Sequence, residues 1–181
     1  MSACLPLAGR RHHNGMVVYV HVFLFPEVDT FVGLVVTPGQ ALIDTGAQHG
    51  VVGPDAYRVI VGKLSEYGLK PRSVPNPGIR ATGIGGASDF QGSYEIPAGL
   101  GGCSGLLTVH VLDDSCPDVP LLLPVDFCER LGMVLDLNTK KAFWKTINKH
   151  STVARLPTGH LAIDLFEFPA NGWENPHESS S

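Results

Sequence analysis

Apolar and polar positions alternate in short segments along most of the chain, as in a protein built from β-strands. Residues 106–112 read LLTVHVL and residues 160–168 read HLAIDLFEF, and both follow the two-residue period of a strand. Other short apolar segments are bounded by Gly, Pro, Asn or Asp, which favours further strands. They cover residues 16–25, 31–36, 41–43, 51–52, 90–96, 119–123, 133–137 and 142–144.

Two segments depart from this pattern and predict helices. Residues 54–69 begin with Pro, and their apolar side chains recur every three or four positions, at Tyr57, Val61, Leu64 and Tyr67. Residues 124–131 also open with Pro and stop before Gly132, which predicts a shorter helix. The sequence therefore predicts an all-β, barrel-like domain with two short helices.

The ends of the chain differ from its middle. Residues 1–15 become polar and predict a flexible leader, and residues 71–78 predict an extended linker. One more strand is expected within a C-terminal extension at 146–170, followed by a disordered polar tail at 171–181. The main domain is therefore expected to span residues 16–145.

Composition and charge narrow the class of protein. With 181 residues, 44% of them hydrophobic, the chain can bury a core. A formal net charge of −4 argues against nucleic acid as the main partner. No apolar run approaches the length of a membrane span, and no signal peptide is recognisable, so we expect an intracellular, cytoplasmic protein. The four cysteines show no C-x-x-C spacing and are expected to be free thiols.

The sharpest chemical signal is the segment ALIDTGA at residues 41–47. An apolar strand ends there in a carboxylate, Asp44, which the Thr45 hydroxyl and the backbone N–H groups of the turn can hold. Gly46 allows another backbone or a ligand to approach closely. A carboxylate supported in this way can act as a general base. The alternative is a local turn in which Asp44 and Thr45 only cap the backbone.

Three segments in order make the chain resemble the retropepsin-like aspartic proteases of retroviruses, retrotransposons and some cellular proteins. They are residues 44–47 (DTGA), a glycine-rich hairpin at residues 82–86 (TGIGG), and residues 119–137 (VPLLLPVDFCERLGMVLDL). The resemblance covers residues 32–144. It implies a mainly β, retropepsin-like acid protease barrel with one or two short helices and a Gly-rich flap hairpin.

The resemblance also assigns roles to residues. Asp44 would be catalytic, and the same turn would support it through Thr45, Gly46 and Ala47. A flap closing on an extended polypeptide substrate would comprise Thr82, Gly83, Ile84, Gly85 and Gly86. Support from a later loop would come from Leu122, Leu123 and Pro124. The resemblance implies an aspartic endopeptidase that needs neither a cofactor nor a metal.

In this family each subunit of a homodimer supplies one catalytic Asp. The sequence agrees, since the chain has no second Asp-Thr-Gly or Asp-Ser-Gly and is short for two lobes. The two Asp44 side chains would share one proton, because carboxylates that close cannot both ionise easily. One would take a proton from water while the other polarises the peptide carbonyl, with no covalent intermediate.

Two places depart from the family pattern and leave an alternative open. Pro124-Val125 stand where the family usually has Gly, followed in retroviral members by a basic residue. Gln48-His49 stand where several viral members have acidic residues. The alternative function is therefore a catalytically silent retropepsin-fold module that binds peptides or mediates dimerisation.

Other polar residues have weaker interpretations. The eight histidines lack the spacing of a metal site. His49 either tunes the pH response near Asp44 or is a solvent-facing turn residue, and we favour the turn. Asp113, Asp114 and Asp118 suggest either an acidic cation site or a solvated turn, and we again favour the turn.

Overall fold

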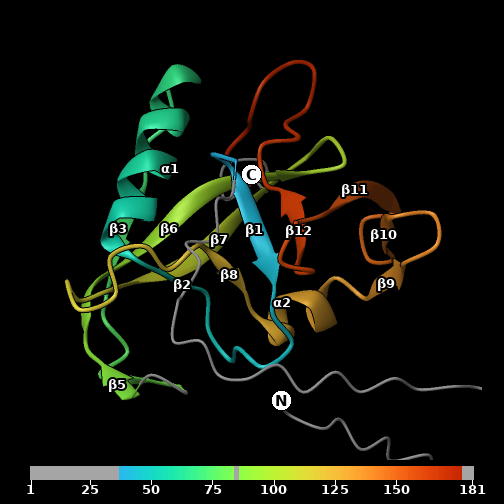
Figure 1. Ribbon diagram of the computed structural model, residues 1–181. Helices are drawn as coiled ribbons and strands as arrows, with labels where there is room; N and C mark the ends of the chain where they lie inside the picture. Colours follow the sequence, from blue (N-terminus) through green and yellow to red (C-terminus); the bar gives the residue numbers. More distant parts are fainter. Residues whose placement is uncertain (1–36, 84–85, 177–181) are drawn as a thin grey trace, which may run out of the picture. The chain divides into compact units, whose positions relative to one another are not determined.

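The structure of the chain, a computed structural model, describes residues 37–83 and 86–176 (Figure 1). The leader at 1–15 and the strands expected at 16–25 and 31–36 lie outside these described residues. No helix in the described ranges has the length and apolar character needed to cross a bilayer.

Strands dominate the described part of the chain, which also holds two helices, and the mainly β fold class is confirmed. The helices are α1 (Pro54–Glu66) and α2 (Val125–Arg130). The strands are β1 (Gln40–Ile43), β2 (Val51–Val52), β3 (Arg72–Val74), β4 (Ala81–Gly83), β5 (Gly86–Ser88), β6 (Phe90–Leu100), β7 (Cys103–Leu112), β8 (Leu122–Leu123), β9 (Met133–Asp136), β10 (Lys141–Trp144), β11 (Lys149–Arg155) and β12 (Leu161–Asp164).

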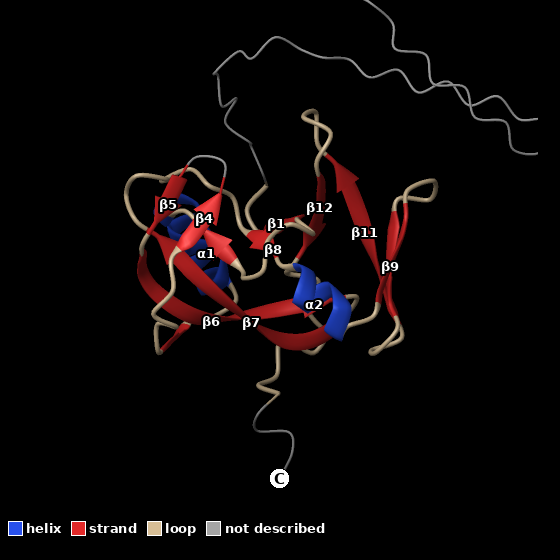
Figure 2. Ribbon diagram, turned by 90° about the horizontal axis from the view of Figure 1, so that it is seen from below, coloured by secondary structure: helices blue, strands red, loops and turns tan. Residues whose placement is uncertain are grey.

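Ten of these strands form one sheet in the order β3-β6-β7-β2-β8-β1-β12-β11-β10-β9. Strands β4 and β5 pair with each other as a separate hairpin, as the glycine pattern predicted. Figures 1 and 2 show this hairpin and the β9–β10 pair at opposite sides of the central strands β1 and β8. The centre of the sheet is therefore occupied by the strand that leads to Asp44.

The sheet closes on itself where the C-terminal end of β6 meets the segment that follows β12. The Gly99 amide donates to the Leu165 carbonyl at 2.6 Å, and the Gly102 amide donates to the Glu167 carbonyl at 3.0 Å. Gly99 also pairs with Phe166 in a parallel bridge. This closure gives the barrel-like arrangement that the strand pattern predicted.

The core is built from strand residues together with one face of each helix. Its largest fully buried side chains include Trp144, Leu64, Ile96, Leu123, Ile163 and Leu165. Cys128 of α2 is buried in the same cluster. The cysteines at 103, 116 and 128 are free thiols, as expected.

Helix α1 matches the prediction at its start and differs at its end. It begins at Pro54 but stops at Glu66, before the expected limit at residue 69. Ile60 and Leu64 are its buried apolar side chains, whereas Tyr67, predicted on the same face, is 50% exposed. The difference arises because Tyr67 already lies in the turn that ends the helix, so its side chain no longer follows the helical period.

Two strands replace segments that the sequence suggested were irregular. The expected linker at 71–78 contains β3, which pairs antiparallel with β6 at the edge of the sheet. The C-terminal extension has two strands instead of one, because β11 pairs with both β10 and β12. In contrast, the strand expected at 119–123 is reduced to β8.

The expected disorder of the tail is wrong for its first residues. The Trp173 indole N–H donates to the Gly105 carbonyl at 3.1 Å, and the Glu174 amide donates to the Ser104 hydroxyl at 3.0 Å. Both partners belong to β7, so the sheet itself provides an anchor that composition alone does not reveal. Residues 177–181 lie outside the described part of the chain.

Gly53, between β2 and α1, is a position where only glycine fits. A Cβ there would meet the carbonyl oxygens of Cys116 and Pro117. We expect Gly53→Ala to lower the free energy of unfolding by about 1–3 kcal/mol, as overpacking does. The measurement is urea unfolding followed by circular dichroism.

Gly62 supplies the matched control for this prediction. It lies inside α1, and no atom outside its own helix would be within 4 Å of an added Cβ. Gly62→Ala is expected to raise the free energy of unfolding by about 0.5–1 kcal/mol through helix propensity. Equal effects of the two substitutions would contradict the steric explanation for Gly53.

Candidate active site

Asp44 directly follows β1, a strand held on both sides. Strand β12 pairs with β1 antiparallel, and β8 pairs with it parallel. Ala41 and Leu42 are buried, and the Asp44 amide donates to the Leu123 carbonyl at 3.2 Å. The sequence thus places one carboxylate at the end of a central strand whose position the core determines.

The turn after Asp44 holds the carboxylate through backbone groups. The Gly46 amide donates to Asp44 Oδ1 at 2.8 Å, and the Ala47 amide donates to the Asp44 carbonyl at 3.2 Å. Asp44 is half-buried, while Thr45 and Gly46 are exposed. The expected contact from the Thr45 hydroxyl to the carboxylate does not occur among the described residues. The backbone of the Asp44 turn (residues 44–47) is therefore held by hydrogen bonds, whereas the tip of the turn is exposed to solvent.

The late loop (residues 122–125) lies directly against the Asp44 turn. Leu42 pairs with Leu122 and Ile43 with Leu123 in the parallel β1–β8 ladder. One step further along, the Val125 amide donates to the Ala47 carbonyl at 2.9 Å. The structure therefore brings together the two groups of residues to which the resemblance gave catalytic and supporting roles.

Pro124 is accommodated as the residue that precedes α2. Its φ of −73° and ψ of 157° are extended, and its carbonyl accepts the Cys128 amide at 3.3 Å. A proline has no N–H to donate, but the hydrogen bond to the Asp44 turn comes from the next residue, Val125. This departure from the family pattern therefore leaves the contact between the two loops in place.

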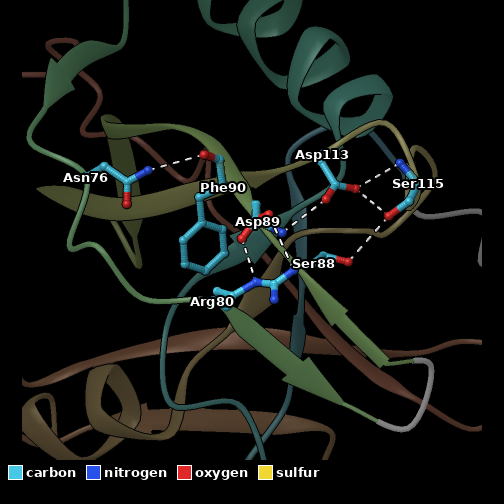
Figure 3. Close-up of polar contacts among 7 residues, drawn as sticks. All are labelled: Asn76, Arg80, Ser88, Asp89, Phe90, Asp113 and Ser115. Carbon is cyan, nitrogen blue, oxygen red and sulfur yellow. Dashed lines mark hydrogen bonds and ion pairs between the residues drawn. The ribbon is translucent and has the colours of Figure 1, made fainter.

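The glycine-rich hairpin is a separate element. Thr82 pairs with Ala87 and Gly83 pairs with Gly86, while Ile84 and Gly85 lie outside the described residues. No hydrogen bond in the described ranges joins this hairpin to the Asp44 turn. Its hydrogen bonds and its ion pair gather instead at its base, around Asp89 and Asp113 (Figure 3).

A histidine pair links His49, just after the Asp44 turn, to His110 of β7. His49 is exposed, and its ring meets the ring of His110 edge-on at 5.7 Å between centroids. His110 is buried, stacks on Phe90, and places Nδ1 2.7 Å from the Ser93 hydroxyl. Burial, and secondly the nearby His49, lowers the pKa of His110 below its ordinary value. The favoured solvent-facing position of His49 is confirmed, and no sequence signal pointed to His110.

The lowered pKa of His110 predicts a loss of stability in mild acid. As the pH falls below about 6.5, His110 takes up a proton in the unfolded chain before it does so in the folded protein. The free energy of unfolding should therefore fall from about pH 6.5 downward, and His110→Gln should reduce this slope. Thermal unfolding between about pH 5 and 7 measures it, with the exposed His160→Gln as control. A slope unchanged in the His110 variant would contradict this interpretation.

The acidic residues near β7 fall into two groups. Asp114 and Asp118 are exposed, as a solvated turn predicts. The Asp113 carboxylate is different, because it accepts hydrogen bonds from the backbone of Asp89 and from Ser115. Within the ranges the structure describes, no cluster of three or more His, Cys, Asp or Glu residues could hold a metal ion.

Comparisons with known proteins give a likeness among solved structures. No family model and no curated protein matches the chain. Among solved structures, it is similar to the crystal structure of the retroviral protease-like domain of Ddi1 from Leishmania major, with 23% identity and a TM-score of 0.39. The match covers 60% of this chain and 80% of that domain. The function proposed below rests on the residues of this chain.

Proposed function

We propose that the chain is an aspartic endopeptidase of the retropepsin type, with Asp44 as its catalytic residue. The observation that carries this proposal is the fixed position of a carboxylate at the end of a buried strand. Leu123 and Val125 of the late loop hold the turn from one side by backbone hydrogen bonds. A rigidly held carboxylate is what general acid–base catalysis requires.

The second carboxylate of the reaction would come from a second copy of the chain. The sequence contains one Asp-Thr-Gly, and Thr45 and Gly46 at the tip of the turn are exposed. Two such tips meeting around a two-fold axis would bring both Asp44 side chains together. The exposed Thr45 hydroxyl would then be available to bond across the interface.

The two carboxylates would act as one unit that shares a proton. The ionised Asp44 takes a proton from a bound water, which attacks the peptide carbonyl carbon. The protonated Asp44 donates a hydrogen bond to the carbonyl oxygen and stabilises the charge that develops there. The tetrahedral intermediate collapses when the Asp44 that took the proton from water passes it to the leaving nitrogen, and the enzyme forms no covalent bond to the substrate.

An extended polypeptide is the substrate that fits this proposal best. The β4–β5 hairpin pairs with no other strand among the described residues, and its backbone would pair with a substrate strand. Such pairing recognises the peptide main chain without demanding a particular side chain. The preferred cleavage sequence would then depend on the residues that line the completed dimer.

Cleavage of a diverse peptide pool, read by mass spectrometry between about pH 4 and 7, tests the proposal directly. The mass of the protein in solution is measured in parallel. Cleavage by a dimer that Asp44→Asn abolishes would support the enzyme. A confirmed dimer that cleaves nothing would favour the alternative, a silent retropepsin-fold module that binds peptides or mediates dimerisation. A strict monomer would contradict the shared dyad.

A further inference from the structure

Within the part of the chain that the structure describes, the β4–β5 hairpin pairs with no strand outside itself. It forms a two-stranded sheet, separate from the ten-stranded sheet that contains the core. An isolated two-stranded hairpin is marginally stable in water. Among the described residues, the contacts that join it to the rest of the protein lie at its base.

One ion pair joins the residues that flank the two strands of the hairpin at this base. Arg80 precedes β4 and Asp89 follows β5, and their side chains form an ion pair with Nε 2.6 Å from Oδ1. Both side chains are largely exposed, which limits the strength of the pair. This ion pair closes the hairpin but does not attach it to the rest of the protein.

Asp113 provides the main attachment (Figure 3), beside longer contacts from the Ser88 hydroxyl of β5 to Ser115 Oγ at 3.4 Å and Cys116 Sγ at 3.5 Å. Asp113 Oδ2 accepts the Asp89 amide at 3.0 Å, and the Asp113 amide in turn donates to the Asp89 carbonyl at 3.0 Å. Asp113 Oδ1 accepts the Ser115 amide at 2.9 Å and also the Ser115 hydroxyl. Both carboxylate oxygens of Asp113 therefore accept hydrogen bonds, one from the end of the hairpin and one from the loop after β7.

Asp113 itself stands on a well-fixed part of the protein. It directly follows Leu112, which is buried and pairs with Phe90 at the start of β6. The loop that Asp113 begins is bonded in turn to the region before α1, because the Gly53 amide donates to the Val119 carbonyl at 2.7 Å. The same region continues through β2, which pairs with β8 beside the Asp44 turn. A chain of backbone contacts thus connects the hairpin base to the candidate active site.

We propose that Asp113 is the positioning residue that orients the β4–β5 hairpin for substrate binding. Its assignment as a substrate-positioning group rests on the proposed peptidase function. Its attachment of the hairpin does not, because it follows from the hydrogen bonds alone. Asp113 acts through the hairpin and does not contact the reacting atoms.

The charge of Asp113 suits this role in acid. Hydrogen bonds from the Ser115 side chain, then from the Ser115 and Asp89 amides, lower the pKa of Asp113 below its ordinary value. The carboxylate therefore remains an acceptor at the mildly acidic pH where a shared-proton dyad works. The stabilisation it gives is present above the ordinary pKa of Asp and is lost as the pH falls through the lowered value.

Amide hydrogen exchange of Asp113→Asn tests the attachment without any need for activity. The amide side chain keeps the size of Asp but has one acceptor oxygen, so either Asp89 or Ser115 loses its partner. We expect exchange across residues 80–90 to become about tenfold faster. Exchange in β10 and β11, far from the hairpin, should stay as in the wild type and serves as the internal reference.

Asp114→Asn is the matched control. Asp114 lies next in the chain and loses the same charge on substitution, but its carboxylate accepts a hydrogen bond from the Gln91 side chain at 2.9 Å. It should leave hairpin exchange unchanged. Ser115→Ala provides a second variant if Asp113→Asn loosens the whole protein. It removes the hydroxyl contacts to both Asp113 and Ser88 and should speed hairpin exchange about threefold. Hairpin exchange in Asp113→Asn equal to that in Asp114→Asn would overturn the proposal.

Kinetics then test the substrate-positioning part. For a peptide that the wild type cleaves, Asp113→Asn should raise KM about five- to tenfold and leave kcat within about twofold. An unchanged KM with faster hairpin exchange would show that Asp113 holds the hairpin but does not position substrate. If the wild type cleaves nothing, the peptidase proposal fails, and the exchange experiment still decides the attachment.

Discussion

Replacing Asp44 with Asn is expected to abolish peptide hydrolysis while leaving the fold intact. An amide cannot take a proton from water or share one with its partner, so kcat/KM should fall by at least about 1,000-fold. The Asn oxygen can still accept the Gly46 amide, which now donates to Asp44 Oδ1 at 2.8 Å. The variant should therefore unfold at the wild-type temperature. Asp118→Asn, at an exposed position remote in sequence from the Asp44 turn, is the control for charge.

Mixing wild type with Asp44→Asn distinguishes a shared dyad from a site within one chain. After subunits have exchanged at equal concentrations, about a quarter of the dimers contain two Asp44 residues. The mixture should then show about a quarter of the activity of the same total concentration of wild type. Activity of about one half would mean that each chain acts alone. Wild-type activity in pure Asp44→Asn would assign the chemistry to another residue.

Trp144→Ala is expected to be the most destabilising of the substitutions considered. The Trp144 side chain is fully buried, meets Phe127 of α2 edge-on, and donates from Nε1 to the Ser151 hydroxyl at 3.1 Å. Removing an indole from such a site leaves a cavity and lowers the free energy of unfolding by about 3–5 kcal/mol. The melting temperature should fall by roughly 10 °C, measured by calorimetry.

The other tryptophan of the chain provides the comparison. Trp173 is half-buried, and its indole N–H bonds to the Gly105 carbonyl in the tail–β7 contact. Trp173→Ala should lower the free energy of unfolding by only about 1 kcal/mol. Similar losses for the two variants would mean that the tail belongs to the core as fully as β10 does.

Local signals predicted the elements nearest to the candidate site. The apolar segment before Asp44, the Pro at the start of α1 and the glycines of the hairpin each mark a structure formed by neighbouring residues. The contact between the late loop and the Asp44 turn followed from the family resemblance. What that resemblance did not provide is the atom that makes it, the Val125 amide, since Pro124 has no N–H to donate.

The missed features depend on partners that are distant in sequence. Strand β3 has two exposed residues and is a strand because β6 lies beside it. Strand β11 is rich in polar residues, and its buried Ser151 satisfies its hydroxyl by donating to Glu167 at 2.7 Å. The sequence pattern indicates an ordinary turn residue at Asp113, because its hydrogen-bond partner Asp89 is separated from it by the whole β6–β7 hairpin. Such pairings cannot be inferred from periodicity.

The pairing of β1 with β12 sets an order of events during synthesis. Gln40 pairs with Asp164, and Leu42 pairs with Ala162, so the strand that carries Asp44 is flanked by one of the last strands of the sheet. Long loops must close before such contacts form, which slows folding. A chain still on the ribosome lacks β12 until residues 161–164 have emerged. If Asp44 is catalytic, the nascent protein therefore cannot hydrolyse peptide bonds. Its peptidase activity appears only after nearly the whole described domain has been translated.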